Sequence, residues 1–166
     1  MKKPHFTFPI PAIILFAVFF LSAELSSATS KMPPFSLAEV TDGKTVDSQE
    51  FQGKALLVTF FATWCPPCME EVPTLIKLQE EFAKDGFSVI GLSLDEGGPG
   101  VVVRLIRKQG INYPVVMANS GTIRDFGGVY GIPMSFLVNR NGNVVKRYTG
   151  DVPHSVLVKD IKNVMD

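Results

Sequence analysis

The sequence predicts an α/β fold in which a central mixed β-sheet is flanked by helices, with a β-hairpin added on the N-terminal side. Two continuous apolar runs, residues 55–61 and 87–94, are rich in β-forming residues, which is the pattern of strands buried on both faces. Residues 70–82 lie between them and repeat apolar positions with the spacing of a helix. Residues 134–138 and 144–148 flank an Asn-Gly pair, which favours a hairpin. This alternation of strands and helices, followed by a hairpin, indicates helices on both faces of a mixed sheet.

The remaining elements are shorter. The N-terminal hairpin turns at Asp42-Gly43, and residues 95–100 (D-E-G-G-P-G) are expected to form a loop. The other predicted elements are strands at 35–37, 44–46 and 115–117, a helical turn at 122–126, and helices at 101–109 and 153–164. We find no internal repeat and no second domain, so residues 33–166 form one predicted domain.

The first 28 residues differ in kind from the rest. Lys2 and Lys3 precede 14 uncharged residues, 10–23, and Ser26-Ser27-Ala28 supplies the small residues of a cleavage site. A basic start, an apolar middle and a small-residue end are the three regions of a secretory signal. Residues 1–28 are therefore expected to be a signal peptide or an N-terminal membrane anchor, and the sequence leaves these alternatives open. Either one places the domain in the periplasm or on the extracytoplasmic face of a bacterial membrane.

The charges give no sign of a polyanionic partner. The chain has 16 basic and 16 acidic residues, and it lacks the clustered basic run that nucleic-acid binding requires. Cleavage after Ala28 removes two lysines and one glutamate and leaves the remainder close to neutral. We therefore expect no nucleic-acid partner, and we do not expect electrostatic steering to be the main means of finding a partner.

The two cysteines, Cys65 and Cys68, are separated by only two residues. A structural disulfide explains this pair poorly, because so short a loop constrains the unfolded chain little. A zinc site needs four ligands, and the only histidines are His5, in the export segment, and His154, which we expect on the surface. A peroxidatic cysteine of the peroxiredoxin kind would follow an upstream Pro and Thr and would not stand in a CxxC pair. Redox chemistry of the pair is favoured, without a metal or an organic cofactor.

The position of the pair supports this chemistry. Cys65 lies at the start of the helix predicted after the strand at 55–61, where the positive end of the helix dipole favours thiolate over thiol. The thiolate is the species that attacks a disulfide, and Cys68, one turn further on, can resolve the mixed disulfide. Pro66 and Pro67 are tolerated because the first amides of a helix have no partner within it.

Several separated motifs resemble one family. Residues 58–73 (V-T-F-F-A-T-W-C-P-P-C-M-E-E-V-P) are similar to the membrane-associated and periplasmic thioredoxin-like proteins of the TlpA, ResA and cytochrome c maturation (CcmG) type. Residues 131–138 (G-I-P-M-S-F-L-V) resemble the cis-proline segment of that family, and residues 128–131 (G-V-Y-G) resemble the segment before it in the cytochrome c maturation members. The resemblance runs from about residue 33 to the C-terminus. It implies a thioredoxin-like fold and a thiol–disulfide oxidoreductase.

The resemblance also implies roles for individual residues. Cys65 would be the nucleophile and Cys68 the resolving thiol. Pro133 would be cis and face the disulfide, and the backbone of Ile132 would be offered to a strand of a partner. Trp64 is either part of the core or a flat apolar side chain that shields the thiol and contacts partners, and its place beside an exposed nucleophile favours the second.

Glu71 matches a carboxylate that these proteins place near the active site. The alternative is a solvated charge on the helix surface, like its neighbour Glu70. One departure bears on this choice, because ordinary thioredoxins carry a buried Asp six residues before the first cysteine and this chain has Thr59 there. Proton transfer for Cys68 must then come from another group, and Glu71 is the available candidate.

The sequence thus predicts an exported thiol–disulfide oxidoreductase that reduces disulfides of partner proteins, for example in cytochrome c maturation. Because the periplasm is kept oxidising, a reductant there needs a membrane-embedded electron donor. The missing amides of Pro66 and Pro67 favour this direction, since they leave the Cys65 thiolate less stabilised. The alternatives are an oxidant that introduces disulfides and a non-catalytic redox or copper-handling adaptor of the same fold. We expect a monomer.

Overall fold

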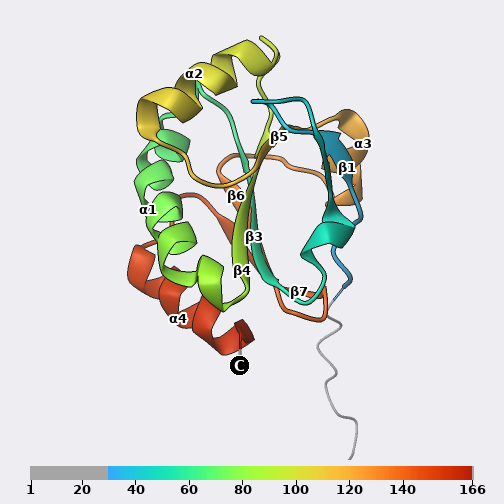
Figure 1. Cartoon of the computed structure of the whole chain (residues 1–166), viewed down its shortest axis with the longest axis vertical. Coiled ribbons are helices and arrows are strands. Elements are labelled where there is room, and N and C mark those ends of the chain that lie inside the picture. The colour runs from blue at the N-terminus through green and yellow to red at the C-terminus, as the bar shows by residue number, and fades with distance from the viewer. Residues whose placement is uncertain (1–29, 166) are drawn as a thin grey trace, which may run out of the picture.

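The computed structural model describes residues 30–165, and the predicted export segment lies outside this range. Two apolar strands lie at the centre of the molecule, between helices on either side (Figure 1). They belong to a five-stranded sheet with the order β5-β4-β3-β6-β7. β3 (Ala55–Phe61) and β4 (Phe87–Ser93) are parallel, and every residue in both is buried. The two apolar runs are therefore the central strands, as predicted.

The outer strands complete a mixed sheet. β6 (Met134–Val138) pairs antiparallel with β3 and continues through the predicted hairpin into β7 (Val144–Thr149). β5 (Val115–Met117) pairs parallel with β4 on the other side. Because β6 runs against β3, the start of β6 lies beside the end of β3, and this edge of the sheet holds the candidate site.

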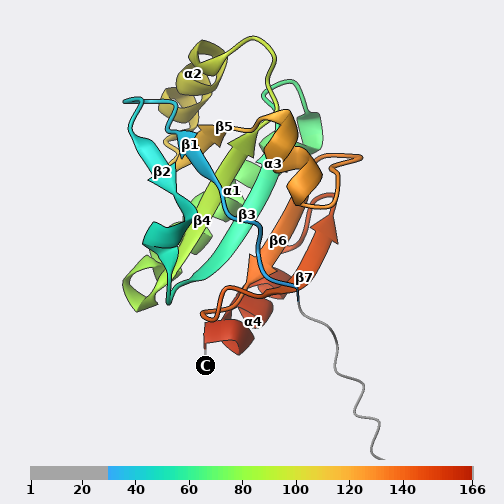
Figure 2. The ribbon, with the colours of Figure 1, turned by 90° about the vertical axis from the view of Figure 1, so that its right-hand side faces the viewer.

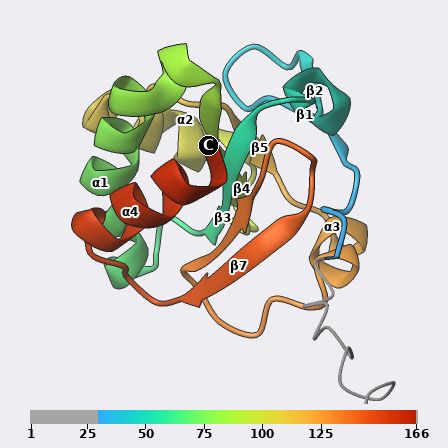
Figure 3. The same cartoon turned by 90° about the horizontal axis from the view of Figure 1, so that it is seen from below.

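The helices cover both faces unequally (Figure 3). One face packs against α1 (Pro66–Phe82), α2 (Pro99–Gln109) and α4 (His154–Met165), which contribute leucine, valine and isoleucine side chains to one core cluster. The opposite face is covered by α3 (Ser120–Asp125) and by the N-terminal hairpin, whose apolar residues form a second cluster with that face. A short helical turn, η2 (Ala83–Asp85), links α1 to β4.

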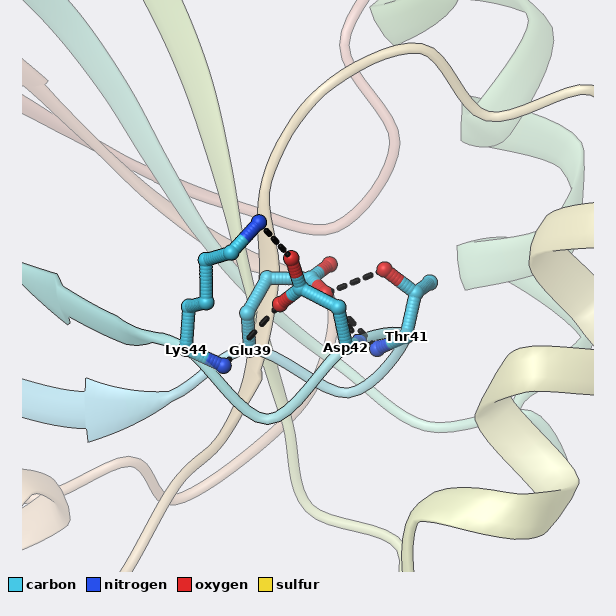
Figure 4. A network of polar contacts seen from close by, with 4 residues as sticks. All are labelled: Glu39, Thr41, Asp42 and Lys44. Atoms are coloured by element: carbon cyan, nitrogen blue, oxygen red, sulfur yellow. Dashed lines mark hydrogen bonds and ion pairs between the residues drawn. The ribbon is translucent and has the colours of Figure 1, made fainter.

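The N-terminal hairpin is a separate two-stranded sheet of β1 (Ser36–Ala38) and β2 (Thr45–Asp47), followed by the turn η1 (Ser48–Phe51) (Figure 2). Its loop is held by two carboxylates (Figure 4). Glu39 accepts hydrogen bonds from the amides of Thr41 and Asp42, at 2.7 and 3.2 Å, and Asp42 pairs with Lys44 at 2.6 Å. This polar network explains why the chain turns at the predicted Asp42-Gly43.

Helix starts differ most from the predictions. α1 begins at Pro66, as the predicted place of Cys65 at the helix start requires, although the apolar repeat that predicted the helix begins only at residue 70. The predicted loop 95–100 ends at Gly98, since Pro99 occupies the first turn of α2, where a missing amide costs nothing. Within residues 30–165, no helix combines the length and apolarity needed to cross a bilayer.

Candidate active site

The Cys65–Cys68 pair lies where the chain passes from β3 into α1. Cys65 has an extended backbone and is the N-cap of α1, and its Sγ forms a disulfide with Cys68 one turn further on. The Cys68 amide donates to Cys65 Sγ at 3.3 Å. Since Pro66 and Pro67 have no N–H, this is the first amide after Cys65 that can stabilise negative charge on its sulfur.

The disulfide is almost completely enclosed, with Cys65 4% and Cys68 1% exposed. Trp64, directly before Cys65, is 67% exposed. Trp64 is therefore not part of the core, and its indole lies at the surface where a partner approaching Cys65 would meet it. The first of its two predicted roles is therefore wrong, whereas contact with partners stays a prediction, because the neighbouring Cys65 is buried and not exposed as expected.

The Ile132–Pro133 bond is cis, as the resemblance implied. It lies just before β6, and the pairing of Met134 with Phe60 brings it to the end of β3 from which the Cys pair follows. The carbonyl oxygen of Ile132 is 3.7 Å from Cys65 Sγ. Pro133 and the disulfide, 65 residues apart in the sequence, thus share one site.

Glu71 is buried, whereas its neighbour Glu70 is exposed. The alternative of a solvated surface charge is therefore wrong for Glu71. It follows Cys68 by three residues, so the two side chains occupy the same face of α1. Burial raises the pKa of Glu71 to about 7, and the negative charge of Asp151 adds to this effect. Within the described part of the chain, its Oε1 has no hydrogen-bond partner.

Tyr113 is a buried neighbour of this carboxyl group that the sequence did not point to. Burial raises the pKa of Tyr113, and the charge of Glu71 raises it further. Tyr113 belongs to the segment that leads into β5, far from the CxxC motif in the sequence. A lone tyrosine before a short strand carries no signal that would associate it with the cysteines.

Thr59, which stands where thioredoxins carry a buried Asp, has a neutral partner. Ser135 lies directly opposite it on β6, and the Ser135 hydroxyl donates to Thr59 Oγ1 at 2.9 Å. Both residues are buried. This pair cannot accept a proton near neutral pH, which leaves Glu71 as the carboxyl group on the Cys68 face of α1.

A second buried carboxylate, Asp95, was also missed. It follows β4 and accepts hydrogen bonds from the backbone and hydroxyl of Thr63, two residues before Cys65. The sequence placed Asp95 in a polar loop and gave no partner for it. Its position directly after a buried strand that neighbours β3 was the available signal.

His154 lies away from the disulfide, with Nε2 3.4 Å from Glu81 Oε1. It is intermediate in exposure, partly covered where we expected a surface residue. Among residues 30–165, no group of three or more His, Cys, Asp and Glu side chains is arranged to hold a metal ion.

Comparisons with known proteins place this chain in a family. The family model described as Redoxin matches residues 27–165. The ResA thiol–disulfide oxidoreductase of Bacillus subtilis is 31% identical over 146 residues, covering 88% of this chain and 80% of that protein. The ResA protein of Halalkalibacterium halodurans is 29% identical over 140 residues, covering 84% and 78% of the two chains.

Solved structures agree in fold. A thioredoxin-family thiol:disulfide interchange protein from Chlorobium tepidum superimposes with a TM-score of 0.78 and 37% identity, covering 83% of this chain and 97% of that one. A second structure from this organism, described as a DsbE interchange protein, gives a TM-score of 0.76 at 28% identity with the same coverage. The fold is thioredoxin-like, and the chain belongs to the Redoxin family as a thiol–disulfide oxidoreductase of the ResA and DsbE type, with Cys65 and Cys68 as its CxxC pair.

Proposed function

We propose that this chain is an exported reductant that transfers two electrons to disulfides of partner proteins, for example in cytochrome c maturation. The supporting observation is the surroundings of Cys65 Sγ. Pro66 and Pro67 remove two amides, and the Cys68 amide is left to stabilise the thiolate, together with the helix dipole. Weak stabilisation of the thiolate favours the disulfide form of the enzyme, so the reduced enzyme gives up its electrons readily.

In this reaction the Cys65 thiolate attacks one sulfur of a partner disulfide. A mixed disulfide forms, and the other partner sulfur leaves as a thiolate. The Cys68 thiol then loses its proton and attacks Cys65 Sγ, which releases the second partner thiol and forms the Cys65–Cys68 disulfide. A membrane-embedded donor returns two electrons and completes the cycle on the extracytoplasmic side.

Glu71 is the proposed acceptor of the Cys68 proton. Its pKa of about 7 suits exchange of a proton near neutral pH, and it lies one helical turn from Cys68 on the same face. Asp151 helps to hold this pKa up, because its negative charge disfavours ionisation of Glu71. The neutral Thr59–Ser135 pair cannot perform this step.

Pro133 and Trp64 are proposed to receive the partner. The Ile132 carbonyl oxygen, before Pro133, lies 3.7 Å from Cys65 Sγ, where a partner strand carrying the attacked disulfide can be aligned. The exposed indole of Trp64, directly before Cys65, offers apolar contact to such a partner.

Activity and redox direction can be tested separately. Residues 30–166 should reduce a protein disulfide when supplied with a chemical dithiol, Cys65→Ser should abolish this activity, and Cys68→Ser should accumulate mixed disulfides. Equilibration with glutathione should give a potential near thioredoxin's value of about −270 mV, far from the roughly −120 mV of a strong oxidant. A wild-type potential close to the second value would overturn the reductant assignment and favour an enzyme that introduces disulfides.

A further inference from the structure

The buried carboxylate of Asp95 joins the end of β4 to the segment that presents Cys65. Asp95 is 6% exposed. The Thr63 amide lies 3.0 Å from Oδ2 and 3.2 Å from Oδ1, the Thr63 hydroxyl donates to Oδ1 at 2.5 Å, and the Ser93 hydroxyl donates to Oδ2 at 2.9 Å. Both carboxylate oxygens thus accept hydrogen bonds, mainly from Thr63 in the connection between β3 and α1.

Apart from the core packing of Ala62 and Cys65 and the disulfide, few contacts hold this connection. Between the end of β3 and the start of α1, the Cys65 amide donates to the Ala62 carbonyl at 3.1 Å, and Trp64 is largely exposed. Thr63 is therefore the residue through which the connection is fixed to the neighbouring strand. Hydrogen bonds to an ionised acceptor are short and strong, so the Asp95 carboxylate suits this purpose.

We propose that Asp95 is a positioning residue for thiol–disulfide exchange, acting through Thr63 to hold Cys65 and Trp64 in place for attack on a disulfide. The same residues border an open depression of about 430 Å³, lined by Thr63, Trp64, Asp95, Glu96, Gly97 and Val101. The Asp95–Thr63 hydrogen bonds thus fix one wall of the depression next to the nucleophile. This role rests on the exchange activity of the Cys pair and applies whichever direction of electron flow the protein uses.

Two pairs of variants test the role of the Asp95–Thr63 hydrogen bonds. Asp95→Asn keeps the size of the side chain but replaces one acceptor oxygen by an NH₂ group that cannot accept from Thr63 or Ser93. Thr63→Val removes the hydroxyl donor and keeps the amide, whereas Thr63→Ser keeps both donors. Asp47→Asn is the matched control, since Asp47 also accepts from a backbone amide, that of Gln49 at 2.8 Å, but in the N-terminal hairpin.

The measurement is the reaction of the reduced protein with a small aromatic disulfide, followed across pH. The plateau at high pH reports Cys65 once it is fully ionised, so it separates positioning from the effect of the Asp95 charge on the thiol pKa. We expect the plateau rate to fall about tenfold or more in Asp95→Asn and to fall less in Thr63→Val, because small misplacements of a reacting atom are costly. Thr63→Ser and Asp47→Asn should keep the wild-type plateau.

A second readout uses the single tryptophan of the chain, Trp64. Its fluorescence should change on reduction of the neighbouring disulfide in the wild type, and this change should be altered in Asp95→Asn and Thr63→Val but not in Asp47→Asn.

If Asp95→Asn folds and keeps both the plateau rate and the fluorescence change, Asp95 is structural only and the proposal is wrong. If Asp95→Asn does not fold, the comparison of Thr63→Val with Thr63→Ser decides, and equal plateaus overturn it. Loss of reaction in the wild type itself would instead contradict the exchange activity.

Discussion

Glu71 links the chemistry of the site to the stability of the protein. Its pKa is raised from 4.5 to about 7, so the folded state holds the proton more tightly than the unfolded state does. Between these two values the folded protein binds more protons, and the free energy of unfolding therefore falls as the pH rises from about 4.5 to 7. Well above pH 7, Glu71 is ionised in both states, and the free energy of unfolding falls no further on its account. A shift of this size corresponds to about 3 kcal/mol.

Glu71→Gln should remove this pH dependence. In urea unfolding of the oxidised protein, the wild type is expected to lose up to about 3 kcal/mol between pH 4.5 and 8, and the variant should lose much less. Glu70→Gln, a change at the exposed neighbour, should keep the wild-type slope. Equal slopes for Glu71→Gln and the wild type would show that the buried carboxyl group does not titrate in this range.

The same substitution should change the reactivity of the thiols. If Glu71 accepts the proton of Cys68, Glu71→Gln slows the resolving step, so a mixed disulfide with a partner peptide decays more slowly near pH 7. Raising the pH should restore the rate, because hydroxide and buffer can then deprotonate Cys68. Decay can be followed after quenching with acid, and matching pH profiles for the two proteins would exclude this role.

At the scale of elements, the central strands were predictable, whereas the surroundings of the site were not. Ala55–Phe61 and Phe87–Ser93 are strands because buried parallel strands require continuous apolar runs, and this requirement is local. The surroundings of Glu71 depend on residues that are distant in the sequence, since the charge of Asp151 acts on its carboxyl group and the buried Tyr113 feels its charge. Sequence spacing places Glu71 on the face of Cys68, but it does not say what lies opposite that face.

Substitutions of Pro67 in the first turn of α1 give a second test of redox direction. Pro67→Ala restores one amide near Cys65 Sγ, and Pro67→His adds a possible cation. Both should stabilise the thiolate and make the potential more oxidising, with the larger shift for His. Pro73→Ala is the control, because it also restores an amide in α1 but two turns beyond the sulfur, and it should leave the potential unchanged. An unchanged potential in both Pro67 variants would remove the basis of the proposed direction.

At the scale of the whole molecule, the candidate site and the hydrogen bonds of Arg140 lie at opposite ends of the sheet. The Cys pair follows the end of β3, whereas the β6–β7 turn lies beside its start (Figure 2). That turn carries Arg140, whose guanidinium donates to the carbonyl oxygens of Met165 and Asp85, both at 2.9 Å, and of Gly53 at 3.4 Å. One side chain thus joins the hairpin to the end of α4, to η2 and to the segment before β3.

Arg140→Ala should therefore lower stability without changing the chemistry. Loss of hydrogen bonds from a charged donor to three backbone carbonyls at the surface is expected to cost about 1 kcal/mol or somewhat more, because water replaces part of each bond. Arg140→Lys should recover little of this loss, since an ammonium group lacks the planar fork that reaches three acceptors at once. Urea unfolding measures the cost, and equilibration with glutathione measures the potential, which should stay at the wild-type value. A changed potential in Arg140→Ala would mean that the two ends of the sheet are coupled. The expectation that the Arg140 hydrogen bonds do not affect the redox site would then be wrong.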